Sequence, residues 1–495
     1  MSQATLLIRT DANVAIGTGH VMRCLALAQA WQDVGGSVTF AIREAPLAIK
    51  QRLIAEGFSI IRTAGTPGSA ADAGSTAALA HKLGARWIVV DGDRFEASFL
   101  ERLRSPGLRI LLMDDFAGRK SFPADLVVNP NLGFKRERYR DKVPDHALLL
   151  GSSYVFLRRE FGSLRGKRVF PKTGNRILVT LGGSDPENLA PKIARTLAEI
   201  PEYEITLVAG PGYTHTIESP LQANRNIRIV RNPPNMPALM ARADIAIIAG
   251  GGTLWELLYM GCAVLSYSRN EVQQQIVDEL AARDATHDMG ATKKFKPTAL
   301  VSAVAGIANS KSRRMKMSKI GRQVLDGLGT VRILRAMSDA GVETNVVTMM
   351  PVVSSERSQF LNMARNHFLE LDSSFVPRDD WKQQYFDTIQ ANRQFFLRWI
   401  LHNGDKAGFI LFGTEKHRFL PRKTGMIYEL YIAPEFRKRG IARACAAQAI
   451  AELQNLGPTK IQLEVMEGNT AAVALWKSLQ FLKVSERYVL AGGVR

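Results

Sequence analysis

The chain holds 495 residues, which predicts two to four domains because domains usually contain about 100–200 residues. Apolar residues make up 46% and charged residues 22%, which excludes disordered, collagen-like and membrane-embedded classes. The formal net charge of +19 would suit a nucleic acid or an anionic membrane, but the charges are mostly dispersed along the chain. We therefore favour a basic enzyme that handles phosphorylated substrates, and expect no nucleic-acid partner.

The cysteine content and the hydropathy pattern indicate the compartment. Cys24, Cys262 and Cys445 lie far apart without a CxxC spacing, which argues against a disulfide framework and a cysteine-based zinc site. The apolar run at residues 6–8 is too short for a signal peptide, and no run of about eighteen apolar residues could span a membrane. The sequence predicts a cytoplasmic protein that does not insert into a membrane.

Short β-branched segments alternate with helical stretches from the start of the chain to about residue 165. The predicted strands cover residues 6–10, 37–42, 87–91, 109–114 and 125–129. The helix predicted from Gly19 to Val34 places Val21, Leu25 and Trp31 near one face. Apolar strands separated by such helices predict a parallel sheet covered on both faces, in a Rossmann-like domain of residues 1–165.

The same alternation begins again after the basic segment 165–176. The predicted strands here cover residues 176–181, 204–209, 226–230, 244–249 and 263–268. They predict a second Rossmann-like domain over residues 172–340. Two such domains in succession predict a cleft between them that could hold a nucleotide derivative.

The pattern changes near residues 344–354. A helix-rich beginning is followed by strand candidates at residues 398–402, 407–413 and 426–433, whose alternation of period two favours antiparallel pairing. The chain is therefore predicted to be of the α/β class, with a third domain over residues 352–495.

A glycine loop, Gly17-Thr18-Gly19-His20, follows the first predicted strand and opens the first helix. Unpaired N–H groups at a helix start suit a diphosphate or another developing negative charge. An imidazole there has a suitable pKa for proton transfer near neutral pH. A dinucleotide fingerprint is not predicted, because Met22 stands where GxGxxG requires its third glycine.

Two more glycine loops follow strands of the second domain, at residues 182–186 and 250–253. Ligands of open α/β sheets bind at these strand ends. The loops can present N–H groups to phosphates, and Glu256 can accept hydrogen bonds from ribose hydroxyls. The alternative for the loop at 250–253 is a tight turn that only caps a helix.

A basic segment spans residues 311–322 and reads as an amphipathic helix. We favour a solvated helix face, with weak peripheral contact to anionic lipid as the alternative. The basic residues of this segment are Lys311, Arg313, Arg314, Lys316, Lys319 and Arg322.

In the third domain, a strand at residues 427–432 runs into a glycine turn at Gly440 and then an alanine-rich helix. Backbone N–H groups converge at such a turn, and Arg437, Arg439 and Arg443 add positive charge. Together these features predict a cradle for a pyrophosphate.

The motifs of the first two domains resemble the UDP-2,4-diacetamido-2,4,6-trideoxy-β-L-altropyranose hydrolase family, a relative of the GT-B glycosyltransferase that adds GlcNAc to the peptidoglycan lipid precursor. The motifs are GTGHxxR at 17–23, DDFAGR at 114–119, YxxLRREF at 154–161, GGSDP at 182–186 and GGGTxxE at 250–256. The resemblance covers residues 5–335. It implies a GT-B fold and an enzyme that hydrolyses a UDP-sugar at the anomeric carbon with inversion. His20 would be the catalytic base or a relay to the attacking water.

The same resemblance implies the residues that hold the substrate. Near Gln273, Val272 replaces the family's usual asparagine, which changes that part of the sugar pocket. We expect no metal ion, because helix dipoles and N–H groups disperse the diphosphate charge in this fold, and the Asp91-Gly92-Asp93 sequence is predicted not to bind one. The implied UDP-sugar ligands are Gly17, Gly19, Arg23, Gly183, Ser184, Gly251, Gly252, Thr253, Glu256 and Gln273.

Residues 352–490 resemble the GNAT acetyltransferases through an R-x-x-G-x-A loop and an N-x-x-A-x-x-L helix start at Asn469. The resemblance implies acetyl-CoA as cosubstrate and Glu429 as base, with a salt-bridged strand residue as the alternative. Trp476 stands where many members carry a tyrosine acid, so the acid is open among Tyr428, Tyr431, Tyr488 and solvent. The implied acetyl-CoA contacts are Leu430, Ile432, Arg437, Arg439, Gly440, Ala442 and Asn469.

Together the two resemblances imply a bifunctional enzyme of pseudaminic acid or related nonulosonate biosynthesis. It would N-acetylate an amino-sugar precursor and hydrolyse UDP from the UDP-2,4-diacetamido-2,4,6-trideoxyhexose. The alternative is a GT-B glycosyltransferase fused to an acetyltransferase with an unrelated acceptor.

Overall fold

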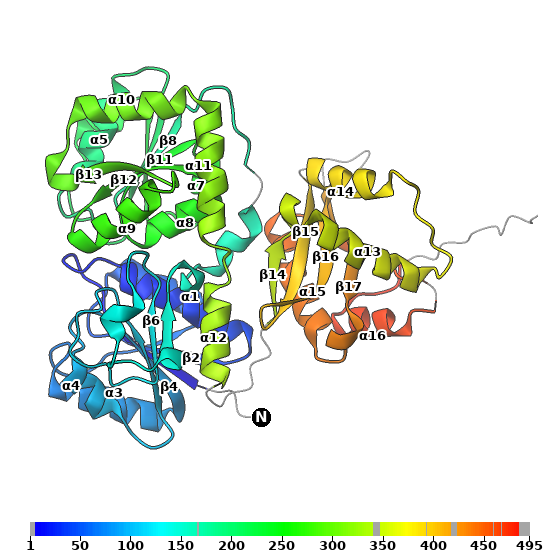
Figure 1. Ribbon diagram of the computed structural model, residues 1–495, viewed down its shortest axis with the longest axis horizontal. Coiled ribbons are helices and arrows are strands. Elements are labelled where there is room, and N and C mark those ends of the chain that lie inside the picture. The colour runs from blue at the N-terminus through cyan, green and yellow to red at the C-terminus, as the bar shows by residue number, and fades with distance from the viewer. Residues whose placement is uncertain are drawn as a thin grey trace, which may run out of the picture. The chain divides into compact units, whose positions relative to one another are not determined.

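A computed structural model describes residues 5–165, 168–339, 347–392, 394–416, 423–458, 460–466 and 468–484. The chain divides into two compact units, Met1–Val346 and Val347–Arg495 (Figure 1). The first unit contains two parallel sheets and the second a mixed sheet, so the predicted α/β class and its three sheets are confirmed.

The first sheet has seven parallel strands in the order β3-β2-β1-β4-β5-β6-β7. Its central strands are almost fully buried, because helices cover both faces and the strands are nearly continuous runs of Leu, Ile and Val. The strands are β1 (Thr5–Thr10), β2 (Ser37–Ala41), β3 (Ser59–Ile61), β4 (Ala85–Asp91), β5 (Arg109–Met113), β6 (Leu126–Asn129) and β7 (Leu148–Leu150). The helices are α1 (Gly19–Asp33), α2 (Leu47–Ala55), α3 (Ala70–Lys82) and α4 (Ala97–Leu103).

The second sheet has six parallel strands in the order β10-β9-β8-β11-β12-β13. The strands are β8 (Arg176–Thr180), β9 (Glu204–Ala209), β10 (Ile227–Arg231), β11 (Ile245–Ala249), β12 (Ala263–Ser268) and β13 (His287–Ala291). The helices are α5 (Leu189–Ala198), α6 (Ser219–Ala223), α7 (Met236–Arg242), α8 (Gly252–Met260), α9 (Glu271–Ala281), α10 (Pro297–Ala308) and α11 (Lys311–Val324). In both sheets the first strand in sequence lies in the interior, as in doubly wound nucleotide-binding folds.

Helix α12 (Gly329–Asp339) returns to the first sheet, where Figure 1 shows it beside α1. It buries Val331, Ile333, Leu334 and Met337 in the same core as strand β1. The sequence grouped these residues with the second domain, but burial of this apolar stripe places them with the first by packing. The chain therefore crosses between the two halves twice.

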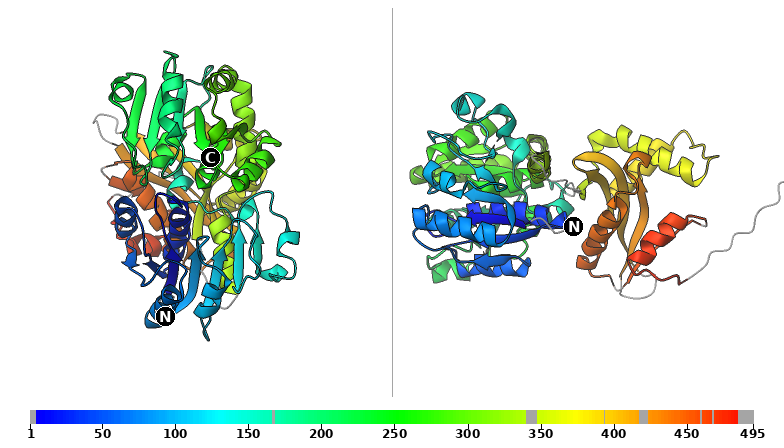
Figure 2. Two further views of the ribbon diagram at one scale, coloured as in Figure 1. Left: turned by 90° about the vertical axis from the view of Figure 1, so that its left-hand side faces the viewer. Right: turned by 90° about the horizontal axis from the view of Figure 1, so that it is seen from below.

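The second unit is a five-stranded sheet in the order β14-β15-β16-β17-β18. The first three pairings are antiparallel, as the alternation predicts, and β17 pairs with β18 in parallel. Figure 2 shows α13 and α14 on one face of this sheet and α15 on the other. The strands are β14 (Val347–Pro351), β15 (Phe395–His402), β16 (Asp405–Lys416), β17 (Lys423–Ile432) and β18 (Lys460–Leu463). The helices are α13 (Arg357–Leu371), α14 (Trp381–Ala391), α15 (Ile441–Asn455) and α16 (Thr470–Ser478).

Candidate active sites

Glycine loops of the two parallel sheets meet at their carboxyl edges. A Cβ atom on Gly183 would lie 2.0 Å from Thr18 Oγ1, so only glycine allows this approach of the loop after β8 to the loop after β1. Ser184 Oγ lies 3.8 Å from the Cβ position of Gly17 in the same place. The structure thus brings together Gly17, Gly183 and Ser184, which the sequence predicted to share one substrate.

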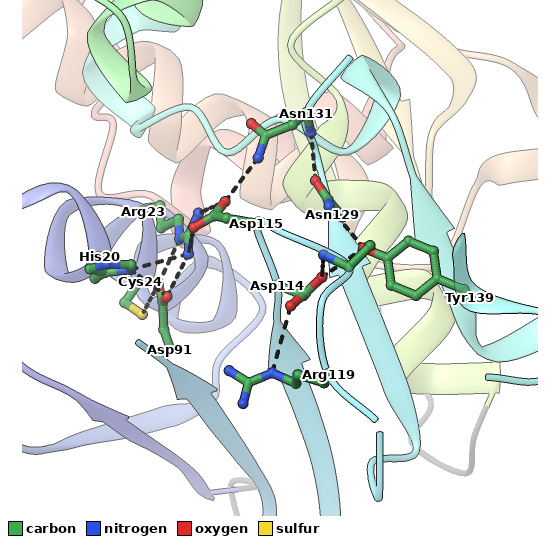
Figure 3. A network of polar contacts seen from close by, with 11 residues as sticks. His20, Arg23, Cys24, Asp91, Asp114, Asp115, Arg119, Asn129, Asn131 and Tyr139 are labelled. Carbon is green, nitrogen blue, oxygen red and sulfur yellow. Dashed lines mark hydrogen bonds and ion pairs between the residues drawn. The ribbon is translucent and has the colours of Figure 1, made fainter. Parts of the chain in front are cut away.

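His20 lies in the first turn of α1, and Asp91 ends strand β4. His20 Nδ1 is 2.7 Å from Asp91 Oδ1, and 15% of the imidazole side chain is exposed (Figure 3). Burial would raise the pKa of Asp91, but Arg23 and His20 hold it well below its usual range. An ionised Asp91 accepts the Nδ1 proton, so neutral His20 carries its lone pair on Nε2. The geometry therefore fixes the tautomer that a general base needs.

Arg23 joins this pair to a second carboxylate. Its Nε donates to Asp91 Oδ2 at 2.7 Å, and its Nη1 donates to Asp115 Oδ1 at 2.7 Å. Asn131 Nδ2 also donates to Asp115 Oδ1, at 2.9 Å (Figure 3). The structure shows Arg23 holding the buried Asp91 and the half-buried Asp115 in place, while its contact with a UDP-sugar stays a prediction.

The charges around His20 decide its protonation. Burial alone would lower the pKa of His20, but the Asp91 carboxylate raises it above its ordinary value of 6.5. An imidazolium formed by taking a proton from substrate is therefore stabilised where it forms.

Asp114, a further carboxylate at this edge of the first sheet, is engaged by protein groups. Asp114 accepts hydrogen bonds from Tyr139 Oη at 2.7 Å and from the Ala117 amide at 2.8 Å (Figure 3). Asp91 and Asp115 are paired with Arg23. Among the residues with described coordinates, no three His, Cys, Asp or Glu side chains are grouped to hold a metal ion. Independence from metal remains a prediction.

Glu256, in the first turns of α8, is paired with Arg158 of the YxxLRREF motif. Arg158 Nη2 is 2.8 Å from Glu256 Oε1, and its Nε is 3.2 Å from the same oxygen. Burial raises the pKa of Glu256. The motif thus links the two halves, and the expected contact of Glu256 with a ribose would have to use the other carboxylate oxygen.

Gln273 lies against the glycine loop at residues 250–253. A Cβ atom added to Gly250 would lie 3.0 Å from Gln273 Cβ, and one added to Gly251 would lie 3.9 Å from Gln273 Nε2. Its Oε1 accepts the Arg269 amide at 3.0 Å. Gly251, with φ of +128°, precedes Gly252 and Thr253, which begin α8. These four predicted ligands therefore lie at one edge of the second sheet.

Sequence reasoning missed Arg269, which directly follows strand β12. Its guanidinium donates to the Leu181 carbonyl, and Nη2 is 3.5 Å from the Cβ position of Gly182. Burial lowers the pKa of Arg269, and Asp185 and Glu187 offset this only in part. No carboxylate of the described chain is within ion-pair distance of it. The signal was a basic residue at the carboxyl end of a strand that neighbours two glycine loops.

The basic segment 311–322 is helix α11, as predicted, but one of its arginines is buried. Arg314 is fully buried and donates to the carbonyls of Ile307, Ala308 and Pro171. The expected exposed position of Arg314 is wrong, because its guanidinium satisfies carbonyls at the end of helix α10. The exposed Lys316 pairs with Asp284 at 2.7 Å. No helix in the described ranges is long and apolar enough to cross a membrane.

In the second unit, strand β17 separates from β18 halfway along its length. The parallel pairing runs from Thr424 to Ile427 and then stops, while pairing with β16 continues to Ile432. Main-chain groups on that edge of residues 428–432 are left without ladder partners. The predicted donor-binding positions Leu430 and Ile432 lie in this segment.

The predicted pyrophosphate turn has the expected backbone. Gly440, with φ of +76°, precedes α15, whose first residues include Ala442. Arg437 Nη2 lies 2.6 Å from Glu370 Oε2, and Arg439 donates to the Glu435 carbonyl at 2.9 Å. Asn469 caps α16 by accepting the Ala472 amide at 3.0 Å. The contacts of these residues with acetyl-CoA stay predictions.

Glu429 lies beside a bulge in β17, where Leu411 faces Glu429 and Phe412 faces Ile427. Burial raises the pKa of Glu429 to about 7. Tyr385 Oη donates to its Oε2 at 2.5 Å, a contact that sequence reasoning missed. In the described part of the chain, no ion pair supports the alternative of a salt-bridged strand residue, because the partner found for Glu429 is this phenol.

The candidate acids of the second unit differ in their surroundings. Tyr428 Oη donates to Glu415 Oε1 at 2.9 Å, and Tyr431 Oη to Glu370 Oε1 at 3.3 Å. Trp476 is buried against Phe481. Tyr488 lies outside the described residues. The identity of the acid therefore stays open.

Comparisons with known proteins agree with this division. Residues 176–327 match the glycosyltransferase family 28 C-terminal domain, and residues 361–481 match the acetyltransferase (GNAT) family. The spinosyn forosaminyltransferase SpnP has the fold of the first unit, with a TM-score of 0.50 at 13% identity over 69% of this chain and 100% of that chain.

Curated relatives cover different parts of the chain. The uncharacterized protein MJ1062 of Methanocaldococcus jannaschii is 21% identical over 97% of each chain. The spore coat polysaccharide biosynthesis protein SpsG of Bacillus subtilis is 26% identical over 49% of this chain and 73% of its own. The UDP-2,4-diacetamido-2,4,6-trideoxy-β-L-altropyranose hydrolase of Campylobacter jejuni is 24% identical over 54% of this chain and 93% of its own. The chain is therefore a homologue of that hydrolase, with a GT-B fold that includes a glycosyltransferase family 28 C-terminal domain and with a GNAT domain at its C-terminal end.

Proposed function

We propose that the first unit hydrolyses a UDP-2,4-diacetamido-2,4,6-trideoxyhexose at the anomeric carbon. Water attacks that carbon as its bond to the diphosphate oxygen breaks, and UDP leaves with the bonding electrons. His20 Nε2 takes the proton of the water, while Asp91 holds Nδ1 and stabilises the imidazolium. The His20–Asp91 contact is the observation that carries this proposal.

The departing diphosphate needs positive charge. Arg269 beside the Gly182 loop supplies a guanidinium without a carboxylate partner in the described chain, and α8 begins at the neighbouring glycine loop. Both are suited to hold a diphosphate without a metal ion. EDTA should leave UDP release unchanged, and strict dependence on added Mg²⁺ or Mn²⁺ would overturn this part.

A glycosyltransferase is the second candidate, because the first unit has the fold of SpnP and contains the family 28 domain. The same imidazole could deprotonate an acceptor hydroxyl in place of water. The two candidates differ in whether UDP release needs an acceptor.

The second unit is proposed to transfer acetyl from acetyl-CoA to an amino group of the sugar. Glu429 takes a proton from the amine as its nitrogen attacks the thioester carbonyl, and the CoA thiolate leaves. The unpaired edge of β17 and the Gly440 turn would hold the pantetheine and the pyrophosphate. The acetylated amino sugar would then be the substrate of the first unit, in the cytoplasm, within pseudaminic acid or related nonulosonate biosynthesis.

The first experiment uses mass spectrometry and UDP detection on a panel of UDP-amino-sugars in H₂¹⁸O. We expect free sugar labelled at the anomeric oxygen without any added acceptor. His20→Ala should abolish this release and keep acetylation. UDP release that requires an acceptor would establish the glycosyltransferase instead.

The second experiment gives the protein acetyl-CoA and a UDP-linked 4-amino sugar and follows CoA release. Gly440→Glu should abolish acetylation, because it places a side chain and a negative charge in a left-handed turn, and should keep UDP release from the diacetamido sugar. No CoA release in the unaltered protein would reject this acceptor.

A further inference from the structure

Tyr385, whose hydroxyl contacts Glu429, is surrounded by aromatic rings. The ring of Tyr385 on α14 is stacked on two others. Its centroid is 5.5 Å from that of Trp381, with an interplanar angle of 11°, and 5.8 Å from that of Phe360, with an interplanar angle of 12°. Phe368 of α13 contacts the Tyr385 ring edge-on at 5.6 Å. Three rings therefore fix the position of the tyrosine, since stacked and edge-on pairs each add to burial.

This arrangement delivers one hydroxyl to one carboxylate oxygen. Tyr385 Oη is 2.5 Å from Glu429 Oε2, and no other hydrogen bond to this carboxyl is found within the described residues. A phenol that donates to Oε2 stabilises the carboxylate and leaves Oε1 for another donor. An amine bound at Oε1 would then be in position to give Glu429 a proton.

The charged groups nearby have other partners. On α13, Glu370 pairs with Arg437, and His367 packs against the ring of Tyr431. On β16, Glu415 accepts from Tyr428, the residue before Glu429. Just before α14, Asp380 accepts from Gln384, and on α14 Asp387 accepts from Arg357. Burial and the Tyr385 hydroxyl thus dominate the titration of Glu429.

We propose that Tyr385 is the positioning residue of the acetyl-transfer base: its hydroxyl fixes the Glu429 carboxylate so that Oε1 meets the acceptor amine. The proposal rests on the proposed role of Glu429 in acetylation. The hydroxyl also limits the rise in the pKa of Glu429, because a hydrogen bond to the charged form opposes the effect of burial. Tyr385 does not touch the acceptor and takes no proton from it.

The test compares the unaltered full-length chain with Tyr385→Phe, which keeps the stacked ring and removes only the oxygen. Glutamate labelled with ¹³C at the carboxyl carbon gives a titration curve for Glu429, which is assigned by its absence in Glu429→Gln. We expect a midpoint near 7 in the unaltered chain. In Tyr385→Phe it should rise by about one pH unit, the size expected for losing a hydrogen bond to an ionised group. A midpoint that stays within about 0.3 units or falls would overturn the proposal.

The acetylation rate supplies the second readout. The acidic limb of kcat/KM should move to higher pH in Tyr385→Phe by the same amount, with a lower plateau because the carboxylate is less well oriented. Gln384→Ala is the matched control, since Gln384 neighbours Tyr385 on α14 and bonds only Asp380 in the described chain. It should change neither the limb nor the plateau. An unshifted limb in Tyr385→Phe would contradict the positioning role.

A third variant guards against a folding defect. Incorporating 3-fluorotyrosine at position 385 leaves the ring in place and makes the hydroxyl a stronger donor, so the Glu429 midpoint should fall. Failure of the proposed function is distinguishable from failure of this inference. If Glu429→Gln acetylates at the normal rate, Glu429 is not the base, and the proposed function fails. If Glu429→Gln loses acetylation while the Tyr385 variants keep the normal rate and the normal Glu429 midpoint, Glu429 remains the base and Tyr385 does not position it.

Discussion

The two candidate bases are controlled in opposite ways. His20 of the first unit is held by charge, because Asp91, Arg23 and Asp115 form a continuous set of ion pairs around it. For Glu429 of the second unit, the two influences are burial and a hydrogen bond from one phenol. Both groups have a raised pKa, but a carboxylate causes the rise in His20 and burial causes it in Glu429.

This contrast shows that a base near neutral pH can be made either from a histidine or from a carboxylic acid whose ordinary pKa is much lower. A histidine needs a neighbouring anion to offset its burial, and a glutamate needs only burial. The first arrangement is sensitive to the loss of one charge, and the second to the loss of one hydrogen bond.

The largest expected effect is that of Asp91→Asn in the first unit. The amide cannot stabilise the imidazolium and does not enforce the Nδ1–H tautomer, so UDP release should fall by about 10³-fold. The acidic limb of the pH–rate profile for UDP release should move to lower pH, because the carboxylate that raises the pKa of His20 is gone. Acetylation provides the internal control and should be unchanged. A loss smaller than about tenfold would mean that Asp91 only fills space.

The matching change in the second unit is Glu429→Gln. It keeps the size of the side chain and removes its basicity, so CoA release with the amino-sugar acceptor should fall by about 10²-fold. Release of UDP from an already acetylated sugar should continue at the normal rate. Near-normal acetylation would show that water or another group takes the proton.

A smaller effect is expected for Arg269→Gln. The variant removes a positive charge near the Gly182 loop, so kcat/KM for UDP release should fall by about tenfold, and UDP should inhibit less strongly as product. Arg231→Gln is a suitable comparison, because Arg231 is an exposed arginine at the end of β10 in the same half. An equal loss in both variants would argue for a general effect of net charge.

The smallest expected effect is on the free energy of unfolding, whose dependence on pH should have opposite signs for the two groups. The pKa of Asp91 is lowered, so its stabilising contribution is complete above the ordinary carboxyl value of 3.8 and is lost as the pH falls through the folded value. The pKa of Glu429 is raised, so its contribution is complete below 4.5 and is lost as the pH rises toward about 7. Calorimetry from about pH 2 to 8 should show stability lost below 3.8 in the first unit and above 4.5 in the second, and each trend should weaken in Asp91→Asn or Glu429→Gln. Parallel trends in both variants would contradict the assigned causes.

Local patterns in the sequence were sufficient to predict most of the architecture. Runs of Val, Ile and Leu mark the buried strands, and glycine before a helix marks the sheet edges where binding is predicted, because both signals lie within a few residues. The loops at Gly17 and Gly183 were predicted to share a ligand, and they do meet.

Contacts over long sequence separations were not predictable in the same way. Asp91 follows His20 by 71 residues, and Tyr385 precedes Glu429 by 44, so no spacing rule connects them. Helix α12 carries an ordinary apolar stripe that could have packed on either sheet. Arg314 shares the basic segment with exposed lysines, and only the carbonyls at the end of α10 account for its burial.

The double passage of the chain between the two halves has a mechanical consequence. Arg165, on the first passage, donates to the main-chain carbonyls of Arg322, Leu325 and Asp326, on the second. One guanidinium thus clasps the outgoing and returning segments at a single place. The two connecting segments are therefore tied to each other by this guanidinium as well as by the chain, so any change in the angle between the halves has to accommodate these hydrogen bonds.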